Sequence, residues 1–171
     1  MREPCRARAA AAARAPNPWQ PGLVRETGLP RSSHSARIAA MNTSLSSTVK
    51  TADWKAEKHV PVIAAPASAK AGEPCDIEID VGKEIPHPNT AQHHIVWIAL
   101  HFVPDGSNTS IELGRADFSA HGASMSDAPG PAATAPSARF RVSLAVPGTL
   151  HATAYCNLHG LWTSAAPIAV K

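Results

Sequence analysis

The chain of 171 residues is long enough for one ordinary domain, and its hydrophobic fraction of 44% is sufficient for a core. Its formal net charge of +3 is unevenly spread: residues 1–40 hold seven Arg and two Glu, a balance of +5, whereas residues 41–171 hold nine basic and eleven acidic residues, a balance of −2. The mildly acidic main part argues against a basic face for nucleic acid, and the absence of any run of 18 apolar residues argues against a membrane-spanning helix.

Residues 1–42 are predicted to be a disordered extension, and residues 43–171 to be the folded domain. The extension is rich in Ala, Arg and Pro, and four prolines between positions 16 and 30 interrupt any helix. Its many Arg and Ser and its few acidic residues resemble an organelle transit peptide. The plainer interpretation is an unfolded extension, or sequence upstream of a start at Met41.

The cysteine content favours a reducing compartment. Cys5, Cys75 and Cys156 are odd in number and irregular in spacing, which is not typical of a disulfide framework. We therefore expect a cytoplasmic protein, with an organelle as the alternative if residues 1–40 are a transit segment. Cys75 is expected to be a small core residue; a Cys75–Cys156 disulfide is the alternative.

From Asp53 onward the chain reads as short β-strands separated by turn signals. The expected strands cover residues 60–63, 75–81, 95–103, 110–118, 139–144, 150–156 and 165–170. A long Gly/Pro/Ala-rich loop is expected over residues 119–138. About seven strands without a helical period predict an all-β antiparallel sandwich. Residues 95–103 are apolar on both faces, so this strand has to be covered twice, by a loop or by another subunit.

A thiol and an imidazole three residues apart follow one of these strands. Cys156 and His159 lie in a turn that ends in Gly160, so one loop directs both side chains to one point. Cysteine is a soft ligand that discriminates between metals, whereas imidazole suits iron, copper and zinc alike. The pair is therefore predicted to be half of a metal site.

Three further histidines are candidates for the other half. They are His59, in a Glu-Lys-His sequence, and His87 and His93. Six residues of extended chain span about 20 Å, so His87 and His93 share a metal only if the chain bends between them. Pro88 and the following Asn favour such a bend. Four histidines and one thiolate exceed the four ligands of structural zinc, and five ligands with an open sixth position suit iron that meets a diatomic molecule.

The remaining histidines are interpreted as surface or hydrogen-bonded residues. This group contains His34, His94, His101, His121 and His151. His94 would point to the opposite side from His93 if a strand begins there.

The stretches that contain these cysteine and histidine residues resemble those of the superoxide reductases, the family of neelaredoxin and of the iron domain of desulfoferrodoxin. The matching stretches, in the family's order, are residues 53–63, 81–90, 93–95, 118–122 and 155–162. The resemblance implies an immunoglobulin-like sandwich and one mononuclear iron per subunit, cycling between Fe(2+) and Fe(3+). It also implies homo-oligomers, dimers or tetramers. Only Cys5 precedes the domain, so the four-cysteine rubredoxin-like centre of some relatives is not expected.

The same resemblance implies a ligand set and a reaction. The ligands would be four equatorial histidines and an axial thiolate, with the sixth position facing solvent; here these are His59, His87, His93, His159 and Cys156. The reaction would be one-electron reduction of superoxide to hydrogen peroxide, with the electron supplied by rubredoxin or a similar small carrier.

Two residues beside His59 are predicted to act in catalysis. Because the folded part carries net negative charge, a local cation has to attract superoxide, and Lys58 is the candidate. Glu57 resembles the family carboxylate that closes over ferric iron after the product has left.

Two other interpretations remain. A blue-copper-like electron-transfer sandwich would use two His, one Cys and a long axial Met, and no methionine follows Cys156. A structural zinc site would need only four of the five candidate ligands.

Overall fold

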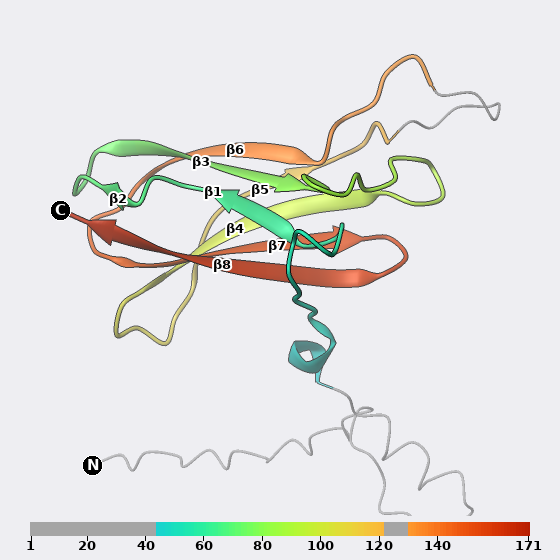
Figure 1. The fold of residues 1–171 in the computed structure, drawn as a ribbon. Coiled ribbons are helices and arrows are strands. Elements are labelled where there is room, and N and C mark those ends of the chain that lie inside the picture. Colours follow the sequence, from blue (N-terminus) through green and yellow to red (C-terminus); the bar gives the residue numbers. More distant parts are fainter. Residues whose placement is uncertain (1–43, 122–129) are drawn as a thin grey trace, which may run out of the picture. The chain divides into compact units, whose positions relative to one another are not determined.

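The computed structural model describes residues 44–121 and 130–171, and this part of the chain is a β-sandwich (Figure 1). A three-stranded sheet contains, in spatial order, β1 (Pro61–Ala64), β3 (Pro74–Val81) and β6 (Ser137–Ser143). A five-stranded sheet contains, in spatial order, β2 (Ser68–Ala69), β8 (Gly160–Val170), β7 (Gly148–Cys156), β4 (Ile95–Pro104) and β5 (Ile111–Asp117). The predicted all-β sandwich is confirmed. The predicted extension, residues 1–42, lies outside the described residues.

The structure adds two details to the strand prediction. The described part has eight strands where about seven were predicted, because β2 adds a two-residue strand parallel to the end of β8. Such a strand is too short to show a pattern, and its backbone is held by pairing with β8. Strand β8 begins at Gly160 rather than at residue 165, because the turn after Cys156 leads directly into the hairpin ladder. The other predicted strands are present, with bounds shifted by a few residues at most.

Strand β3 shows why the alternating residues form a half-buried strand. Ile77 and Ile79 are fully buried against the other sheet, and the acidic residues that alternate with them, Asp76, Glu78 and Asp80, face outward. On that outer face the neighbouring strand β6 carries cations: Arg141 lies 3.3 Å from Asp76, and Arg139 lies near Glu78. The sequence alternation therefore separates an apolar core face from a face of cross-strand ion pairs.

Strand β4 lies between β7 and β5, with one face buried in the core and the other partly covered within the chain. Its inner face buries Ile98 and Leu100 in the core. On its outer face the ring of Trp97 stacks on Tyr155 of β7, with centroids 5.8 Å apart, and the guanidinium of Arg115 from β5 lies 4.5 Å from the Trp97 ring. Side chains of adjacent strands thus provide part of the second cover that the sequence predicted.

Several connections meet at one end of the sandwich, at the right in Figure 1. They are the turn between β7 and β8, the long connection from β3 to β4, and the segment that leads into β1. This leading segment is attached to the edge of β8, because Lys50 donates its backbone N–H to Leu161 and accepts one from Thr163. In the described part of the chain no helix has the length and apolarity that crossing a bilayer requires.

Candidate metal centre

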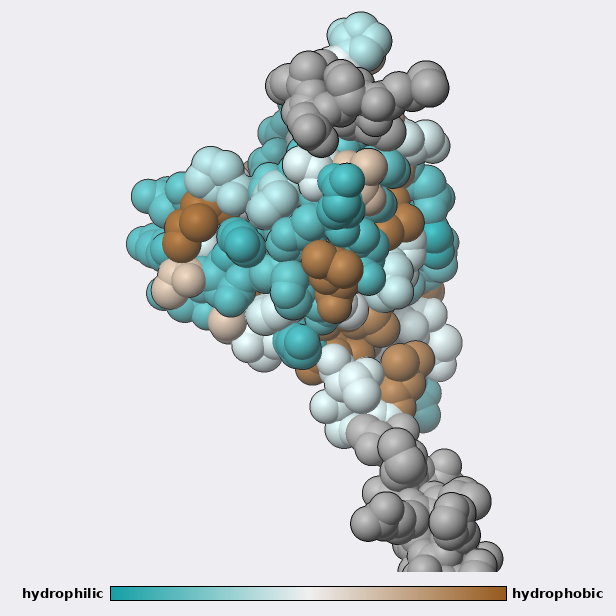
Figure 2. All heavy atoms as spheres, turned by 90° about the vertical axis from the view of Figure 1, so that its right-hand side faces the viewer, coloured by the Kyte–Doolittle hydropathy of each residue, from teal (hydrophilic) through white to brown (hydrophobic). Residues whose placement is uncertain are grey.

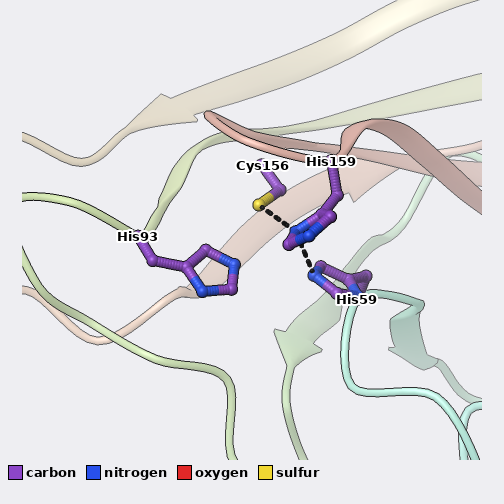
Figure 3. A group of neighbouring side chains, drawn as sticks. All are labelled: His59, His93, Cys156 and His159. Carbon is purple, nitrogen blue, oxygen red and sulfur yellow. Dashed lines mark hydrogen bonds between the residues drawn. The ribbon is translucent and has the colours of Figure 1, made fainter.

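Three imidazoles and one thiol converge where these connections meet (Figure 3). One nitrogen or sulfur atom from each of His59, His93, Cys156 and His159 lies within 4.8 Å of the others. His59 precedes β1, His93 precedes β4, Cys156 ends β7, and His159 lies in the turn before β8. Segments about a hundred residues apart in the sequence are therefore brought to one point.

The turn between β7 and β8 places Cys156 and His159 side by side. Cys156 pairs with Gly160 at the end of the hairpin, and Gly160 has φ +77°, a left-handed conformation that glycine adopts without strain. The Sγ atom of Cys156 lies 3.5 Å from Nδ1 of His159. Cys156 is completely buried and His159 is exposed, so the pair joins the core to the surface.

His59 is oriented by the carboxylate of Glu57. Oε1 of Glu57 accepts hydrogen bonds from Nδ1 of His59, at 2.5 Å, and from its backbone N–H, at 3.2 Å. An ionised carboxylate only accepts, so Nδ1 carries the proton and the lone pair is on Nε2. That Nε2 lies 3.0 Å from Nδ1 of His159. The ring of Trp162 stacks on the His59 ring, with ring centroids 4.9 Å apart.

His87 lies beside the group of four. Its ring centroid is 4.8 Å from that of His59 and 4.6 Å from that of His93. Nδ1 of His87 donates to the carbonyl of Pro88 at 2.6 Å, so its lone pair is on Nε2, a buried atom without a hydrogen-bond partner among the described residues. The backbone of His87 packs against Gly82, where a Cβ atom would lie 2.5 Å from the His87 nitrogen.

His93 completes the ring of imidazoles. Its centroid is 4.9 Å from that of His159, and its buried Nε2 also has no hydrogen-bond partner within residues 44–121 and 130–171. The turn before it is closed by Thr90, whose Oγ1 accepts from the His93 backbone N–H at 3.1 Å and whose own N–H donates to the His93 carbonyl at 3.0 Å. The chain therefore bends between His87 and His93, as the prolines and the turn residues predicted.

The electrostatics of the cluster favour neutral imidazoles. Burial lowers the pKa of His59 and of His93, and it lowers the pKa of His87 to about 4. The positive charge of Lys58, the residue before His59, contributes less than burial to the lowered pKa of all three. Hydrogen bonding to His59 lowers the pKa of Glu57, which keeps the carboxylate ionised.

These donors fit a transition metal ion. Buried ring nitrogens without partners are costly unless something binds them, and the Nε2 atoms of His87 and His93 are two such atoms. Neutral imidazoles present lone pairs, and Cys156 supplies a soft donor. Within the described residues Cys75 and Cys156 form no disulfide, so the alternative disulfide between them is wrong. Cys75 is half-buried against the core, close to its predicted role.

Three of the histidines interpreted as non-ligands have partners outside the cluster. Nδ1 of His94 donates to the carbonyl of Thr90, 2.9 Å away, and the His94 ring stacks on that of His121, with ring centroids 3.6 Å apart. Nε2 of His101, on the outer face of β4, lies 3.7 Å from a carboxylate oxygen of Glu112. His34 lies outside the described residues.

Sequence reasoning missed three residues around the cluster. Asn157 and Trp162 lie within residues 155–162, one of the stretches that resemble the family, and this resemblance could have singled them out. Lys50 donates from Nζ to the carbonyl of His159 at 3.0 Å, and its Nζ lies 5.4 Å from the centroid of the Trp162 ring. No local pattern marks Lys50, because its partner is 109 residues away in the sequence.

The fold and the cluster define a metal-binding β-sandwich with histidine and cysteine donors. Residues 51–165 match the family model of desulfoferrodoxin. The chain belongs to the desulfoferrodoxin family, which confirms the resemblance seen in the sequence.

Individual relatives agree with this assignment. The superoxide reductase of Pyrococcus furiosus is 46% identical over 122 residues, which cover 69% of this chain and 94% of the relative. Neelaredoxin of Megalodesulfovibrio gigas is 42% identical over 123 residues, covering 71% of this chain and 95% of the relative. The solved structure of superoxide reductase (neelaredoxin) from Archaeoglobus fulgidus in the reduced form superposes with a TM-score of 0.64 at 48% identity, covering 71% of this chain and 98% of that one.

Proposed function

We propose that this protein is a superoxide reductase with one mononuclear non-haem iron. The single observation that carries the proposal is the convergence of His59, His93, Cys156 and His159 within 4.8 Å, in a chain of the desulfoferrodoxin family. Relatives that align over almost their whole length are named superoxide reductases.

The proposed ligand set has five members. The hydrogen bonds to Glu57 and Pro88 leave Nε2 as the donor atom of His59 and of His87. The unpartnered Nε2 is the donor of His93, and Nδ1 is the donor of His159, because it faces both Sγ of Cys156 and the His59 ring. Iron suits this mixed set better than zinc, for which four ligands are usual.

The reaction consumes one superoxide, one electron and two protons and releases one hydrogen peroxide. When bound, iron supplies the electron, and a donor protein of the rubredoxin type is proposed to restore it. The chain has to bring an anion to a site within a mildly acidic domain. Lys58 is proposed to supply the local positive charge, since it directly precedes the candidate ligand His59 in the chain. It is also proposed to hold the water that delivers protons.

Two roles in the reaction cycle are proposed for Glu57. In the described conformation it holds the proton on Nδ1 of His59 and so keeps Nε2 available. The family resemblance adds the role of a carboxylate that closes over oxidised iron after the product leaves. For that role Glu57 has to release the hydrogen bond to His59, and its side chain is 32% exposed, which leaves it room to move.

The surface around the site suits a small inorganic substrate. Figure 2 shows this end of the molecule as mainly hydrophilic, with hydrophobic side chains in separate patches. The large apolar residues exposed on the connections at this end are Leu158, at 62%, and Ile85, at 40%. Superoxide needs only an open position and a cation, whereas a large organic substrate would need an extended apolar pocket.

Assembly and location are further parts of the proposal. We propose a homodimer or homotetramer in which the outer face of β4, including Trp97, contributes to an interface. This face is half-buried by its own neighbours and still presents aromatic rings. A cytoplasmic location is proposed from the unpaired cysteines.

The test is a combined metal and product assay on the full chain. Purified protein should contain one iron per chain, consume superoxide in the presence of a reductant, and form peroxide without releasing oxygen. Equal release of oxygen and peroxide would indicate dismutation instead. Bound copper without turnover would favour the electron-transfer alternative, and bound zinc without turnover would favour a structural site.

A further inference from the structure

We propose that Asn157 is a positioning residue whose side-chain amide clamps the segment carrying His93 to the strand end carrying Cys156. This inference rests on the proposed metal centre, but it does not depend on superoxide being the substrate. Asn157 directly follows Cys156, so whatever it holds is fixed relative to the sulfur.

The clamp consists of hydrogen bonds to the two residues that flank His93. Oδ1 of Asn157 accepts from the backbone N–H of His94 at 2.9 Å, and Nδ2 donates to the carbonyl of Gln92 at 2.9 Å. The backbone N–H of Asn157 donates to the carbonyl of His94 at 3.2 Å. His93 is therefore held from both sides by one residue.

The clamp is needed because the regular ladder ends at this point. Strands β4 and β7 pair with a register shift between Ile95 and Trp97, and the last ladder pair is Ile95 with Cys156. A carboxamide carries the same acceptor and donor groups as a peptide unit. The Asn157 side chain thus extends the pairing past the end of β7 and holds a segment that no strand holds.

Local hydrogen bonds alone do not relate His93 to the sulfur. Thr90 closes the turn before His93, but both belong to the same connection between β3 and β4. The bonds of Asn157 span 63 and 65 residues of sequence. Without the side-chain bonds the 90–93 turn would keep its shape, and only the backbone bond from Asn157 to His94 and the Ile95–Cys156 ladder pair would tie it to Cys156. Oδ1 of Asn157 also lies 4.0 Å from Sγ of Cys156, so the clamp lies directly beside the donor.

A double-mutant cycle on ferrous-ion affinity tests this inference. Fe(II) is bound anaerobically, in competition with a chelator, to the full-length wild type, Asn157→Ala, His93→Ala and the double variant. Removing a residue that orients a ligand should weaken metal binding about 10- to 100-fold. If Asn157 acts through His93, its loss should cost little more once His93 is absent, so the double variant should match His93→Ala within about threefold.

The outcomes separate the clamp from the metal centre. An additive loss in the double variant, or no loss in Asn157→Ala, would overturn the clamp. If His93→Ala leaves the affinity for iron unchanged, His93 is not a ligand. Both the proposed ligand set and the role of Asn157 in positioning a ligand are then wrong. Asn108→Ala is the matched control, because it removes an asparagine from the turn at the opposite end of β4. It should leave the affinity for ferrous iron unchanged.

A second measurement needs no metal. In metal-free protein the amide hydrogen of His94 should exchange at least about tenfold faster in Asn157→Ala, since its acceptor is gone. Asn157→Asp keeps an acceptor for this N–H and lacks the donor to Gln92, so it should retain the protection of His94 while still weakening iron binding. Unchanged exchange in Asn157→Ala would contradict the clamp, and Asn157→Asp provides the test if the alanine variant does not fold.

Discussion

The carboxylate of Glu57 accepts a 2.5 Å hydrogen bond from Nδ1 of His59, and this bond decides which nitrogen of His59 faces the other imidazoles. Only Nε2 then lies toward His159, at 3.0 Å from its Nδ1. A residue predicted from the sequence as a catalytic carboxylate is thus also the residue that orients a candidate ligand.

Replacing Glu57 should weaken metal binding. Glu57→Ala leaves Nδ1 of His59 without its acceptor, so the ring can adopt the other tautomer or rotate. We expect iron affinity to fall about tenfold or more, measured by competition with a chelator. Glu73→Ala is the control, because Glu73 pairs only with exposed Lys70 among the described residues. Equal effects of the two variants would contradict the orienting role.

A methyl group at Gly82 should disturb His87. The added Cβ would lie 2.5 Å from the His87 backbone nitrogen, at a residue with φ +80°. We expect Gly82→Ala to lower the free energy of unfolding by at least about 1–2 kcal/mol, because a residue with a Cβ atom is strained in the left-handed conformation. The same substitution should weaken iron binding. Gly106→Ala is a close control: φ is +77° there and nothing lies within 4 Å. Gly106→Ala should lose stability in urea denaturation through backbone strain alone, and it should bind iron as the wild type does.

Substitution of Cys156 should remove the spectroscopic signature of the thiolate. Cys156→Ser keeps the size of the side chain and replaces a soft donor with a weak hard one. The oxidised, iron-loaded variant should lose the visible absorption that arises from charge transfer between sulfur and iron. Cys75→Ser, at the half-buried cysteine in β3, should keep the wild-type spectrum. Visible absorption that persists in Cys156→Ser would exclude Cys156 as a ligand.

The charge of Lys58 should control how fast superoxide is captured. Lys58→Ala should lower the second-order rate constant about tenfold at low ionic strength, measured by pulse radiolysis, without removing the iron. The difference from wild type should shrink as salt is added, because salt screens the attraction. Lys55→Ala is the control, since the Lys55 ammonium lies over the ring of Trp54 at 5.6 Å. A rate that does not depend on Lys58 at any salt concentration would end its electrostatic role.

The metal-free protein should become less stable as the pH falls below about 6.5. Burial lowers the pKa of His87 to about 4, below the value of about 6.5 expected in the unfolded chain. Between these values the unfolded chain binds more protons, so acid favours unfolding. The contribution of His87 is complete above about pH 6.5 and is lost as the pH falls toward its folded pKa. Urea midpoints at several pH values measure this loss, and His87→Gln should give a flatter profile.

The sequence by itself determined the class of fold and the candidate ligands. Alternation in residues 75–81 specifies which side of β3 is buried, because successive side chains of a strand point to opposite faces. The spacing of Cys156, His159 and Gly160 predicts a turn that can bind metal, because two donor residues and a glycine at this spacing form one loop. These are local properties of the chain, and local pattern is sufficient to predict them.

Tertiary structure decided how distant segments meet. Lys50 and Asn157 act on partners 63 to 109 residues away, and nothing in their own neighbourhood indicates those partners. Strand β2 exists only because β8 offers its backbone groups in the right register. The tautomer of His59 follows from the distance to Glu57. Such relationships depend on how the two sheets pack and on where the connections end, and these are determined by the whole chain at once.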